Sequence, residues 1–560
     1  MLSFRPAQRL LCAGLLFLCA VSVGEQRPVT PLLWGFDDIG VRGSDCWNEG
    51  CLTEHPKAGA LLREFGFNLW VTWYPDAACT WDTARNRDYI RKLEGFSDNH
   101  ELHWVVNPLG ALWDTAPEGC VDPQGFDWYL RKDGRRFFLF PQPLLAELGQ
   151  CDHLLGVLYD EPEHHQGNAN AVMGCDHPAI YDPGGDALTD AADAHVQAAQ
   201  SLAEHYGRYG IPLFTEQVFP VMFHDFAAAG FTPGTKVLKE AWSPVYMACA
   251  LGAAYQYGTA LWVSPDLWGI GGYPDHDPDE YRSALLLAYH LGADAIYTES
   301  LALDQGGQGV GSLVRMTAED YEVTPLGEVA KWFIKEHVPA HPRHYRTSDL
   351  CPRVAVIRQE DGCWGQRNAP HTFTPDRLFG NENWRNTELT EAWLDLWHLL
   401  TNGVVPRGGP NWFTTAHQGR DYQVFCPLDG VVVLDHKAKA EHLAGVEVVF
   451  LTGIGISETT LHAVRERVAG GATCVTLPHL APTDIRNRAD EGAPCPEGEG
   501  LWLLSESFLS AQVKAAIARV LPKEDAIRYR FGGTEVTLRP TGGDPNKLSV
   551  RVTVGESRAD

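Results

Sequence analysis

Short apolar runs alternate with helix-like stretches between residues 31 and 343. The runs are continuous, which is typical of strands buried on both faces. They lie at 33–40, 68–74, 102–109, 154–161, 212–219, 236–242, 260–268 and 294–299. Stretches with helical periodicity follow them, for example 56–65, 82–93, 186–209 and 279–291. Eight strands, each followed by a helix, predict an α/β fold of the TIM barrel type, (β/α)8, while an open doubly wound sheet is the competing architecture.

The pattern changes after residue 343. Strand-like runs at 353–357, 446–451 and 473–477 alternate with helical stretches, one of which Ser457 caps and Gly470 ends. This order predicts a flavodoxin-like α/β domain over residues 350–520. Alternating residues with Gly-Gly turns then predict a small C-terminal β region over residues 524–560.

The first 24 residues have the order of a secretory signal peptide. Arg5 and Arg9 precede an apolar run at 10–21, and small residues, Ser22 and Gly24, follow it. This predicts export, so that the mature protein is secreted or periplasmic. No later run approaches transmembrane length, so we expect no membrane anchor.

The net charge and the cysteine content limit the partners, disulfides and cofactors that the sequence predicts. The formal charge is −27, and loss of Arg5 and Arg9 with the signal brings it to −29. Such a chain repels polyphosphate, which argues against nucleic acid as a partner. Twelve of the fourteen cysteines lie outside the signal, so disulfides are expected in an oxidising compartment, with Cys46–Cys51 the easiest to close. No cysteine or histidine spacing indicates a metal, and we expect no cofactor.

Carboxylates recur where the predicted strands end. Asp160 and Glu161 follow the run at 154–161, and Pro162 ends it. Catalytic groups of a barrel lie at these carboxyl ends. Because adjacent side chains of a strand point to opposite faces, the two carboxylates can differ in environment. Asp160 nearby is expected to raise the pKa of Glu161, which suits a general acid.

Aromatic residues recur at the same ends. An aromatic ring can stack on the apolar face of a sugar, while polar side chains hydrogen-bond its hydroxyls. The predicted substrate-binding residues are Trp73, Asn107, Trp242, Trp268 and Tyr297.

Several of these segments resemble a family of enzymes. Asp160-Glu161-Pro162 resembles the Asn-Glu-Pro that ends strand four in the large retaining clan of glycoside hydrolases. Residues 281–297 resemble the helix and eighth strand of family 42, the beta-galactosidase type, and residues 446–478 resemble its flavodoxin-like oligomerisation domain. The resemblance implies a carbohydrate substrate, Glu161 as general acid/base, and a possible homo-oligomer through the second domain.

The second catalytic carboxylate departs from that pattern. On strand seven, where the clan has its nucleophilic glutamate, the nearest carboxylate is Asp266. Glu240 is the leading candidate because Trp242 beside it could hold a sugar ring. The remaining candidates follow in the order Glu299, Asp266 and Glu216.

Three other functions stay open. Asp160-Glu161 also resembles the hexosaminidase-type families, in which an aspartate orients the 2-acetamido group of an N-acetylhexosamine. Without a competent second carboxylate, the barrel would be a carbohydrate-binding pseudoenzyme. A polysaccharide lyase or deacetylase would need a base, for which His164-His165 is the only candidate. The sequence therefore favours a secreted glycoside hydrolase, retaining rather than inverting.

Overall fold

The computed structural model describes most of the chain outside the N-terminal segment. The described residues are 32–38, 52–74, 82–108, 124–125, 129–132, 135–163, 188–218, 220–238, 242–267, 276–302, 311–359, 388–405, 425–490 and 492–555. Within these ranges, no helix is both long enough and apolar enough to cross a membrane.

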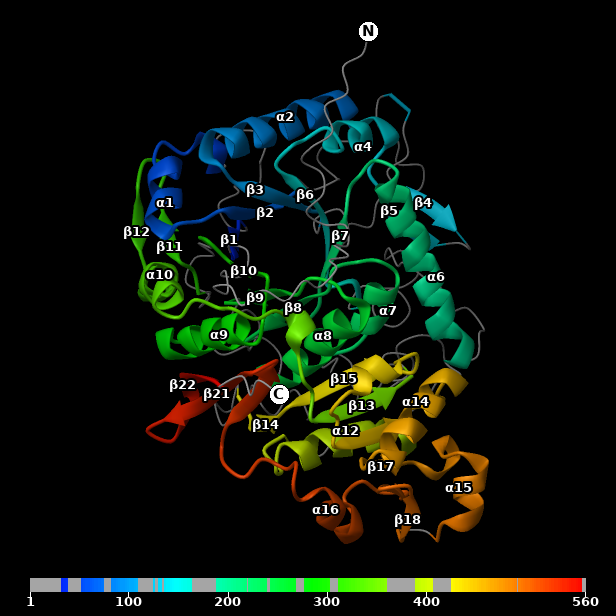
Figure 1. Ribbon diagram of the computed structural model, residues 1–560. Helices are drawn as coiled ribbons and strands as arrows, with labels where there is room; N and C mark the ends of the chain where they lie inside the picture. The colour runs from blue at the N-terminus through cyan, green and yellow to red at the C-terminus, as the bar shows by residue number, and fades with distance from the viewer. Residues whose placement is uncertain are drawn as a thin grey trace, which may run out of the picture.

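Eight parallel strands form a nearly closed barrel (Figure 1). They pair in the order β7-β6-β3-β2-β1-β10-β9-β8, and isolated bridges from 214 to 232 and from 217 to 235 join β7 to the β8 side. The predicted TIM barrel is therefore confirmed over the open sheet. The strands are β1 (Leu33–Asp37), β2 (Leu69–Trp73), β3 (His103–Asn107), β6 (Leu154–Asp160), β7 (Leu213–Glu216), β8 (Gly234–Val237), β9 (Trp262–Pro265) and β10 (Ala295–Thr298).

Helices cover the outside of the barrel. Local capping defines several of their starts: the Asp82 carboxylate accepts hydrogen bonds from the first backbone N–H groups of α2, and Asp277 forms a capping box with Glu280 at α9. The α2 helix runs further than the sequence predicts and ends at Glu101, which has a left-handed backbone. The helices are α1 (Ala58–Phe65), α2 (Thr83–His100), α4 (Gln142–Leu148), α6 (Leu188–Gly207), α7 (Phe223–Ala228), α8 (Ser243–Tyr257), α9 (Pro278–His290), α10 (Pro325–Trp332), the π-helix η3 (Phe333–His337) and α11 (Val338–Ala340).

The barrel region also contains two short β-hairpins, and short 3-10 turns occur along the chain. The hairpin strands pair antiparallel with each other. These elements are β4 (Tyr129–Lys132), β5 (Arg135–Phe138), β11 (Val314–Met316), β12 (Tyr321–Val323), η1 (Leu52–Glu54), η4 (Thr347–Asp349), η5 (Ala440–Leu443) and η6 (Pro478–Leu480).

Side chains fill the inside of the barrel. Alternate residues of each strand point inward, and their neighbours, such as Trp70 on β2 and Trp104 on β3, pack in the core that the helices cover. The barrel is therefore a packed core with no pore, and a ligand can only reach the strand ends. The inward cluster is Leu69, Val71, Val105, Leu158, Phe214, Trp262, Ala295 and Tyr297.

The second domain has the flavodoxin-like strand order. Its sheet pairs as β15-β13-β16-β17-β19, all parallel, with β18 antiparallel at the edge. Counted along the chain, the parallel strands take the order 2-1-3-4-5, as the sequence predicts for this fold. Ser457 caps α14 and Gly470 follows its end, which also agrees with the sequence. The elements are β13 (Val354–Arg358), β15 (Val431–Asp435), β16 (Val448–Thr452), β17 (Thr473–Thr476), β18 (Pro494–Glu497), β19 (Gly500–Leu504), α12 (Glu388–Leu400), α14 (Glu458–Ala469), α15 (Thr483–Arg488) and α16 (Ala511–Ile517).

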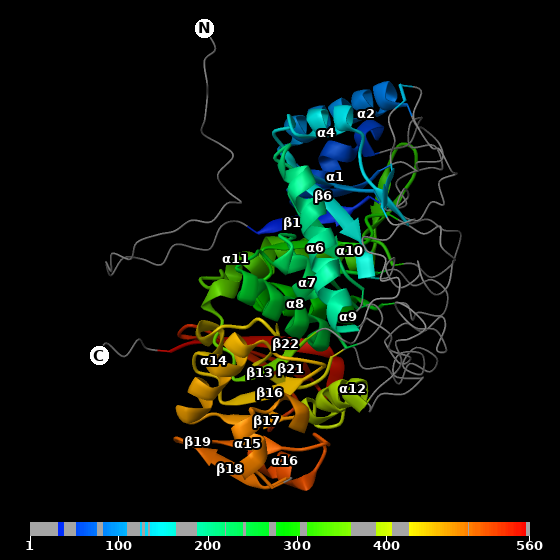
Figure 2. The same cartoon turned by 90° about the vertical axis from the view of Figure 1, so that its right-hand side faces the viewer.

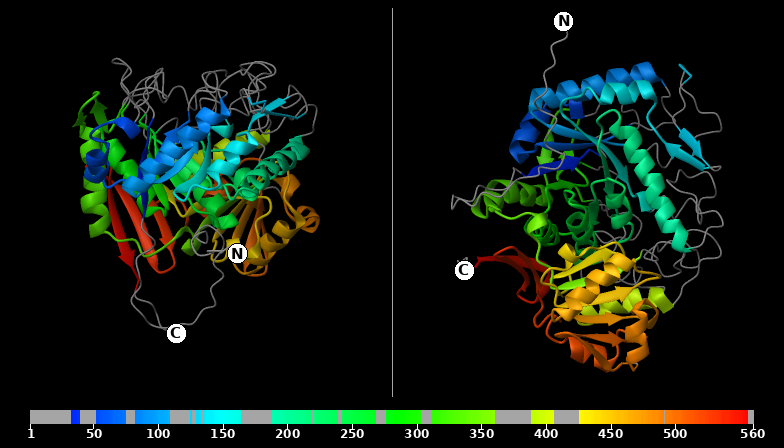
Figure 3. Two further views of the ribbon diagram at one scale, coloured as in Figure 1. Left: turned by 90° about the horizontal axis from the view of Figure 1, so that it is seen from above. Right: turned by 45° about the vertical axis from the view of Figure 1, so that its right-hand side comes forward.

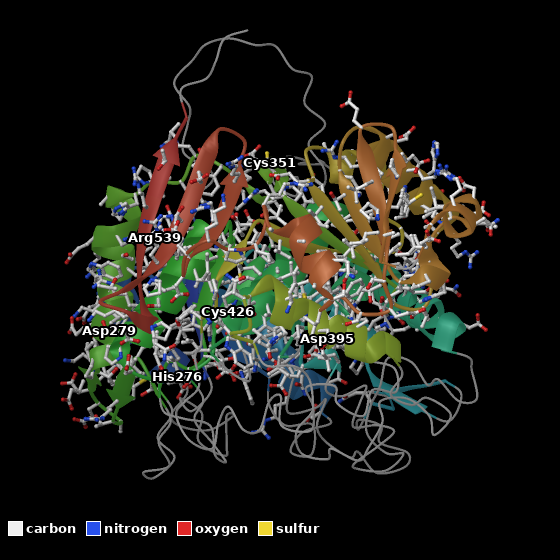
Figure 4. All side chains as sticks on the ribbon, turned by 90° about the horizontal axis from the view of Figure 1, so that it is seen from below. His276, Asp279, Cys351, Asp395, Cys426 and Arg539 are labelled. Carbon is white, nitrogen blue, oxygen red and sulfur yellow. The ribbon has the colours of Figure 1, made fainter. Side chains whose placement is uncertain are left out.

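The C-terminal strands form a separate four-stranded sheet. β20 (Ile527–Phe531), β21 (Thr534–Thr541) and β22 (Asp544–Val554) pair in sequence, and β14 (Leu428–Asp429) joins β20. The sheet packs on α9, where Lys547 Nζ lies 2.8 Å from Asp279 Oδ2 (Figures 3 and 4). The predicted β region is thus attached to the barrel.

The barrel and the flavodoxin-like domain contact each other through α8 and β15 (Figure 1). In Figure 2 the sheet with β13 and β16 lies directly below α8. A Cβ atom at Gly252 would lie 1.8 Å from the carbonyl oxygen of Val433, so the glycine allows the helix to approach the strand backbone. Gln256 Oε1 accepts from the Asp435 backbone at 2.9 Å, and His224 Nε2 lies 3.0 Å from the Val433 oxygen. This interface holds the helix that follows β8, one of the strands that carry the candidate site.

Candidate active site

Five carboxylates converge on one lysine at the carboxyl ends of the barrel strands. Lys236, near the end of β8, is 2% exposed. Its Nζ atom lies 2.8 Å from Glu299, 3.1 Å from Glu161, 3.6 Å from Asp160, 3.6 Å from Asp266 and 3.8 Å from Glu216. We call these five residues the carboxylate cluster. The structure thus brings together five of the six carboxylates that the sequence singles out.

The backbone explains how Asp160 and Glu161 reach the same lysine. On a regular strand they would point to opposite faces. Glu161 instead has a φ of 47°, a left-handed conformation that turns its side chain out of the strand alternation. Its N–H still donates to the Glu216 carbonyl at 2.7 Å, which fixes the turn against β7. The expectation that the two carboxylates lie on separate faces is therefore wrong.

On the other side of the cluster, Asp266 and Glu299 lie on neighbouring segments. They form a parallel bridge just beyond β9 and β10. The Leu267 N–H donates to the Glu299 carbonyl at 2.6 Å. Sheet pairing thus continues one residue past each strand and carries both carboxylates to Lys236.

The cluster has two levels of exposure. The Glu161 side chain is 12% exposed and that of Glu299 is 5%, whereas Asp160, Glu216 and Asp266 are at most 1% exposed. Because Glu161 Oε1 and Glu299 Oε2 both contact Lys236 Nζ, they are within about 6 Å of each other. That is close to the ~5–5.5 Å spacing of carboxyl groups in retaining glycosidases.

Asp160 is held from two sides. Asn107 Nδ2 donates to its Oδ2 atom at 3.0 Å, and Lys236 approaches its Oδ1 atom. Asn107 is itself fully buried. Asn107 and Asp160 therefore form part of the buried base of the carboxylate cluster.

Burial and crowding of like charges perturb the deeper groups. Burial, with the Asp160 and Glu299 carboxylates adding to it, raises the pKa of Glu216 well above its usual range. Burial, and the neighbouring Glu216, likewise raise the pKa of Tyr297. Burial and the like charges of Asp160 and Glu299 therefore favour the protonated form of Glu216.

Lys236 responds in the opposite direction. Burial alone would lower its pKa, but the surrounding Asp160, Glu299, Glu161 and Glu216 outweigh burial and raise the pKa well above its usual range. Lys236 is therefore a fixed ammonium. Its 3.1 Å contact with Glu161 opposes the rise in the Glu161 pKa that the sequence predicts from Asp160, so the two neighbours act against each other on this group.

The aromatic candidates occupy different places. Trp73 is half-buried, and its indole N–H donates to Asp37 at the end of β1. Trp242 is 4% exposed and Tyr297 is 1% exposed, so both lie in the packed interior. Trp268 and Glu240 lie outside the described residues, and their predicted roles stay predictions.

The sequence does not single out Lys236. The predicted strand at 236–242 begins with this residue and ends near Trp242, whereas β8 covers Gly234–Val237. Leu238, with a φ of 73°, ends the strand. This earlier end moves Lys236 from the start of a predicted strand to the rim of the barrel. β8 reads Gly-Thr-Lys-Val, so no apolar run marks this strand and its lysine carries no distinct signal in the sequence.

Metal and cysteine chemistry add no second site within the described ranges. No group of three or more His, Cys, Asp or Glu side chains there is arranged to hold a metal ion. The described cysteines are free thiols, and Cys249 and Cys474 are buried. Cys46 and Cys51 lie outside the described residues, as do His164 and His165.

No protein-family model matches the sequence, and no curated protein matches it. Solved structures that resemble the fold include alpha-L-fucosidase isoenzyme 2 from Paenibacillus thiaminolyticus, at 11% identity and a TM-score of 0.44, over 80% of this chain and 64% of that one. This chain thus spans less than two thirds of that protein. Exo-beta-1,4-mannosidase Op5Man5 from Opitutaceae bacterium strain TAV5 is 11% identical, with a TM-score of 0.44 over 95% and 89% of the two chains. GH5_18 from Bifidobacterium longum subsp. longum ATCC 55813 is 13% identical, with a TM-score of 0.44 over 75% and 97%. Likenesses this distant carry no inference about activity, which has to be argued from the site itself.

Proposed function

We propose that this chain is a glycoside hydrolase that cleaves O-glycosidic bonds with two carboxyl groups and retains anomeric configuration. The observation that carries the proposal is the approach of Glu161 and Glu299 to within about 6 Å at the exposed level of the carboxylate cluster. Inverting enzymes need about 6.5–9.5 Å to admit a water molecule between the groups. Export of the enzyme, inferred from residues 1–24, is part of the proposal.

Glu161 acts as the general acid and then as the general base. In the first step its proton moves to the glycosidic oxygen as the bond from that oxygen to the anomeric carbon breaks. The Glu299 carboxylate forms an ester with the same carbon. In the second step the Glu161 carboxylate takes a proton from water, whose oxygen attacks the anomeric carbon and releases Glu299.

Glu299 is proposed as the nucleophile because of its exposure and position. Asp266 and Glu216 are more deeply buried and further from Lys236. Glu240, the leading candidate from the sequence, stays a prediction. Glu299→Gly should be inactive and recover activity with azide, which can enter the vacated space and attack the anomeric carbon. Azide rescue of Glu240→Gly, with Glu299→Gly still active, would reverse the assignment.

A substrate-assisted N-acetylhexosaminidase is less well supported. Its aspartate must orient the 2-acetamido group, but both oxygens of Asp160 already face Asn107 and Lys236. Turnover confined to 2-acetamido sugars, with Asp160→Asn the most damaging change, would favour that mechanism.

A carbohydrate-binding pseudoenzyme is the second candidate. It is favoured by the burial of most of the carboxylate cluster and by an aspartate, Asp266, at the end of β9. A panel of aryl glycosides, with turnover and binding measured in parallel, separates the two functions. Hydrolysis that Glu161→Gln abolishes supports the enzyme, whereas binding without turnover supports the pseudoenzyme.

A further inference from the structure

Lys236 differs from an ordinary barrel residue in its charge environment. Its five carboxylate partners come from β6, β7, β9 and β10, and the Tyr297 hydroxyl faces the same group from β10. Within the described ranges, no other basic side chain lies within ion-pair distance of these carboxylates. The Lys236 ammonium therefore offsets part of the negative charge of the cluster.

Lys236 is unsuited to act as a nucleophile. An amine attacks a carbonyl or forms a Schiff base only in its neutral form, which desolvation or a neighbouring cation can favour. Here four carboxylates outweigh desolvation and keep the group protonated. The structure thus leaves Lys236 an electrostatic and positioning role.

The distances indicate which carboxylates this role concerns. Lys236 Nζ lies closest to Glu299 and Glu161, at 2.8 and 3.1 Å, and these are also the two most exposed members of the cluster. The remaining three partners lie at 3.6 Å or beyond. The ammonium therefore lies between the two groups to which the proposed hydrolysis assigns the chemistry.

We propose that Lys236 is the positioning residue of this site, and that it holds Glu161 and Glu299 in place and sets the pH range in which Glu299 is ionised. This inference rests on the proposed hydrolase. Before the first step, Lys236 keeps the attacking Glu299 carboxylate charged. Once Glu299 is an uncharged ester, the ammonium stays paired with Glu161, which has just lost its proton and must act as a base.

The test is the pH dependence of kcat/KM in Lys236→Met, which keeps the chain length and removes the charge. A unit charge at 3–4 Å is a strong interaction even at an effective dielectric constant of about 20. We therefore expect the acidic limb of the profile to move up by about two pH units. Lys236→Arg, which keeps a cation, should return the limb toward its wild-type position. A uniform fall in kcat/KM with an unmoved limb would overturn the proposal.

Folding gives a second measurement that does not depend on activity. Without Lys236 the cluster takes up charge at a cost to the folded state. The unfolding free energy of Lys236→Met should therefore fall more steeply than that of wild type as pH rises above about 4.5. Lys331→Met, which removes a lysine that pairs with the partly exposed Glu64 and with Glu328 outside the cluster, is the matched control and should steepen the curve much less. Parallel curves for Lys236→Met would also overturn the proposal.

The pH profile of kcat/KM and the unfolding curves together distinguish a failure of the hydrolase proposal from a failure of the Lys236 proposal. If the wild-type protein hydrolyses no glycoside, the hydrolase is wrong, and the unfolding curves still decide whether Lys236 sets the charge of the cluster. If Lys236→Met does not fold, Lys236→Met/Glu299→Gln removes one charge of each sign and should fold. Failure of both to fold even at about pH 4, below the usual glutamate pKa of about 4.5, would contradict the electrostatic role.

Discussion

Glu216→Gln should stabilise the folded protein at neutral pH. Glu216 is 1% exposed, and burial with the nearby Asp160 raises its pKa in the folded state well above the usual 4.5. The unfolded chain releases this proton as pH rises past about 4.5, while the folded protein keeps it. The folded state therefore loses stability as pH rises toward the folded-state pKa. Glutamine resembles the protonated carboxyl group and removes this loss.

The size of the effect follows from the proton linkage. Each pH unit between the unfolded and folded pKa values is worth about 1.4 kcal/mol of unfolding free energy. The wild-type protein therefore loses stability relative to Glu216→Gln as pH rises from about 4.5 toward the folded-state pKa. The amide gives up the contact of Glu216 with Lys236, which is the longest of the five at 3.8 Å. We expect a net gain of about 1–3 kcal/mol.

Urea unfolding of wild type and Glu216→Gln, followed by tryptophan fluorescence between about pH 4 and pH 8, measures this gain. The difference should be near zero at pH 4 and should grow with pH. Glu322→Gln is the control, because Glu322 is 76% exposed and pairs with Arg315 only at 4.0 Å; its effect should stay within about 0.5 kcal/mol. A Glu216→Gln variant that is less stable than wild type at pH 7 would refute the reasoning.

Two further predictions concern the scaffold. Gly252→Ala should lower the unfolding free energy by about 1–3 kcal/mol, because its Cβ would overlap the Val433 backbone. Gly95→Ala, in the open middle of α2, should instead raise the unfolding free energy by up to about 1 kcal/mol. Equal effects of the two substitutions in denaturant titrations would contradict the packing of α8 on β15. Cys46 and Cys51 should be linked in the exported protein, and peptide mass mapping without reductant that finds both as free thiols would rule the bond out.

The sequence predicts the barrel well because its strands are buried on both faces. Each of the eight strands lies within a predicted apolar run or overlaps it, and the strand-end carboxylates Asp160, Glu161, Glu216, Asp266 and Glu299 follow from those runs. Their convergence on a single atom does not follow. It depends on the left-handed conformation of Glu161 and on the early end of β8. Pro162 indicates that β6 ends but does not indicate a left-handed residue, and no glycine or proline follows β8 before Pro244.

Aromatic residues illustrate a different limit. Tyr297 and Trp242 stand near strand ends, where the sequence predicts sugar contacts, yet both are buried. An aromatic ring gains free energy either by packing in a core or by stacking on a ligand, so residue type alone does not separate the two. Whether a side chain lies inside the barrel, and at what height, depends on the strand register and the shear of the barrel. A short apolar run in the sequence determines neither.

Leaving-group dependence in Glu161→Gln tests the proposed hydrolysis most directly. A general acid is needed to release a poor leaving group such as a methyl or sugar alcohol, and its loss typically costs about 10²–10⁴-fold in rate. A nitrophenyl glycoside needs no such proton, so the first step on that substrate should stay near the wild-type rate, visible as a burst of nitrophenol followed by slow turnover. Rates for both substrates are compared in wild type and Glu161→Gln at the same pH. A large loss on the poor leaving group with a retained burst on the good one is expected; a near-wild-type rate on the poor leaving group would contradict Glu161 as the acid.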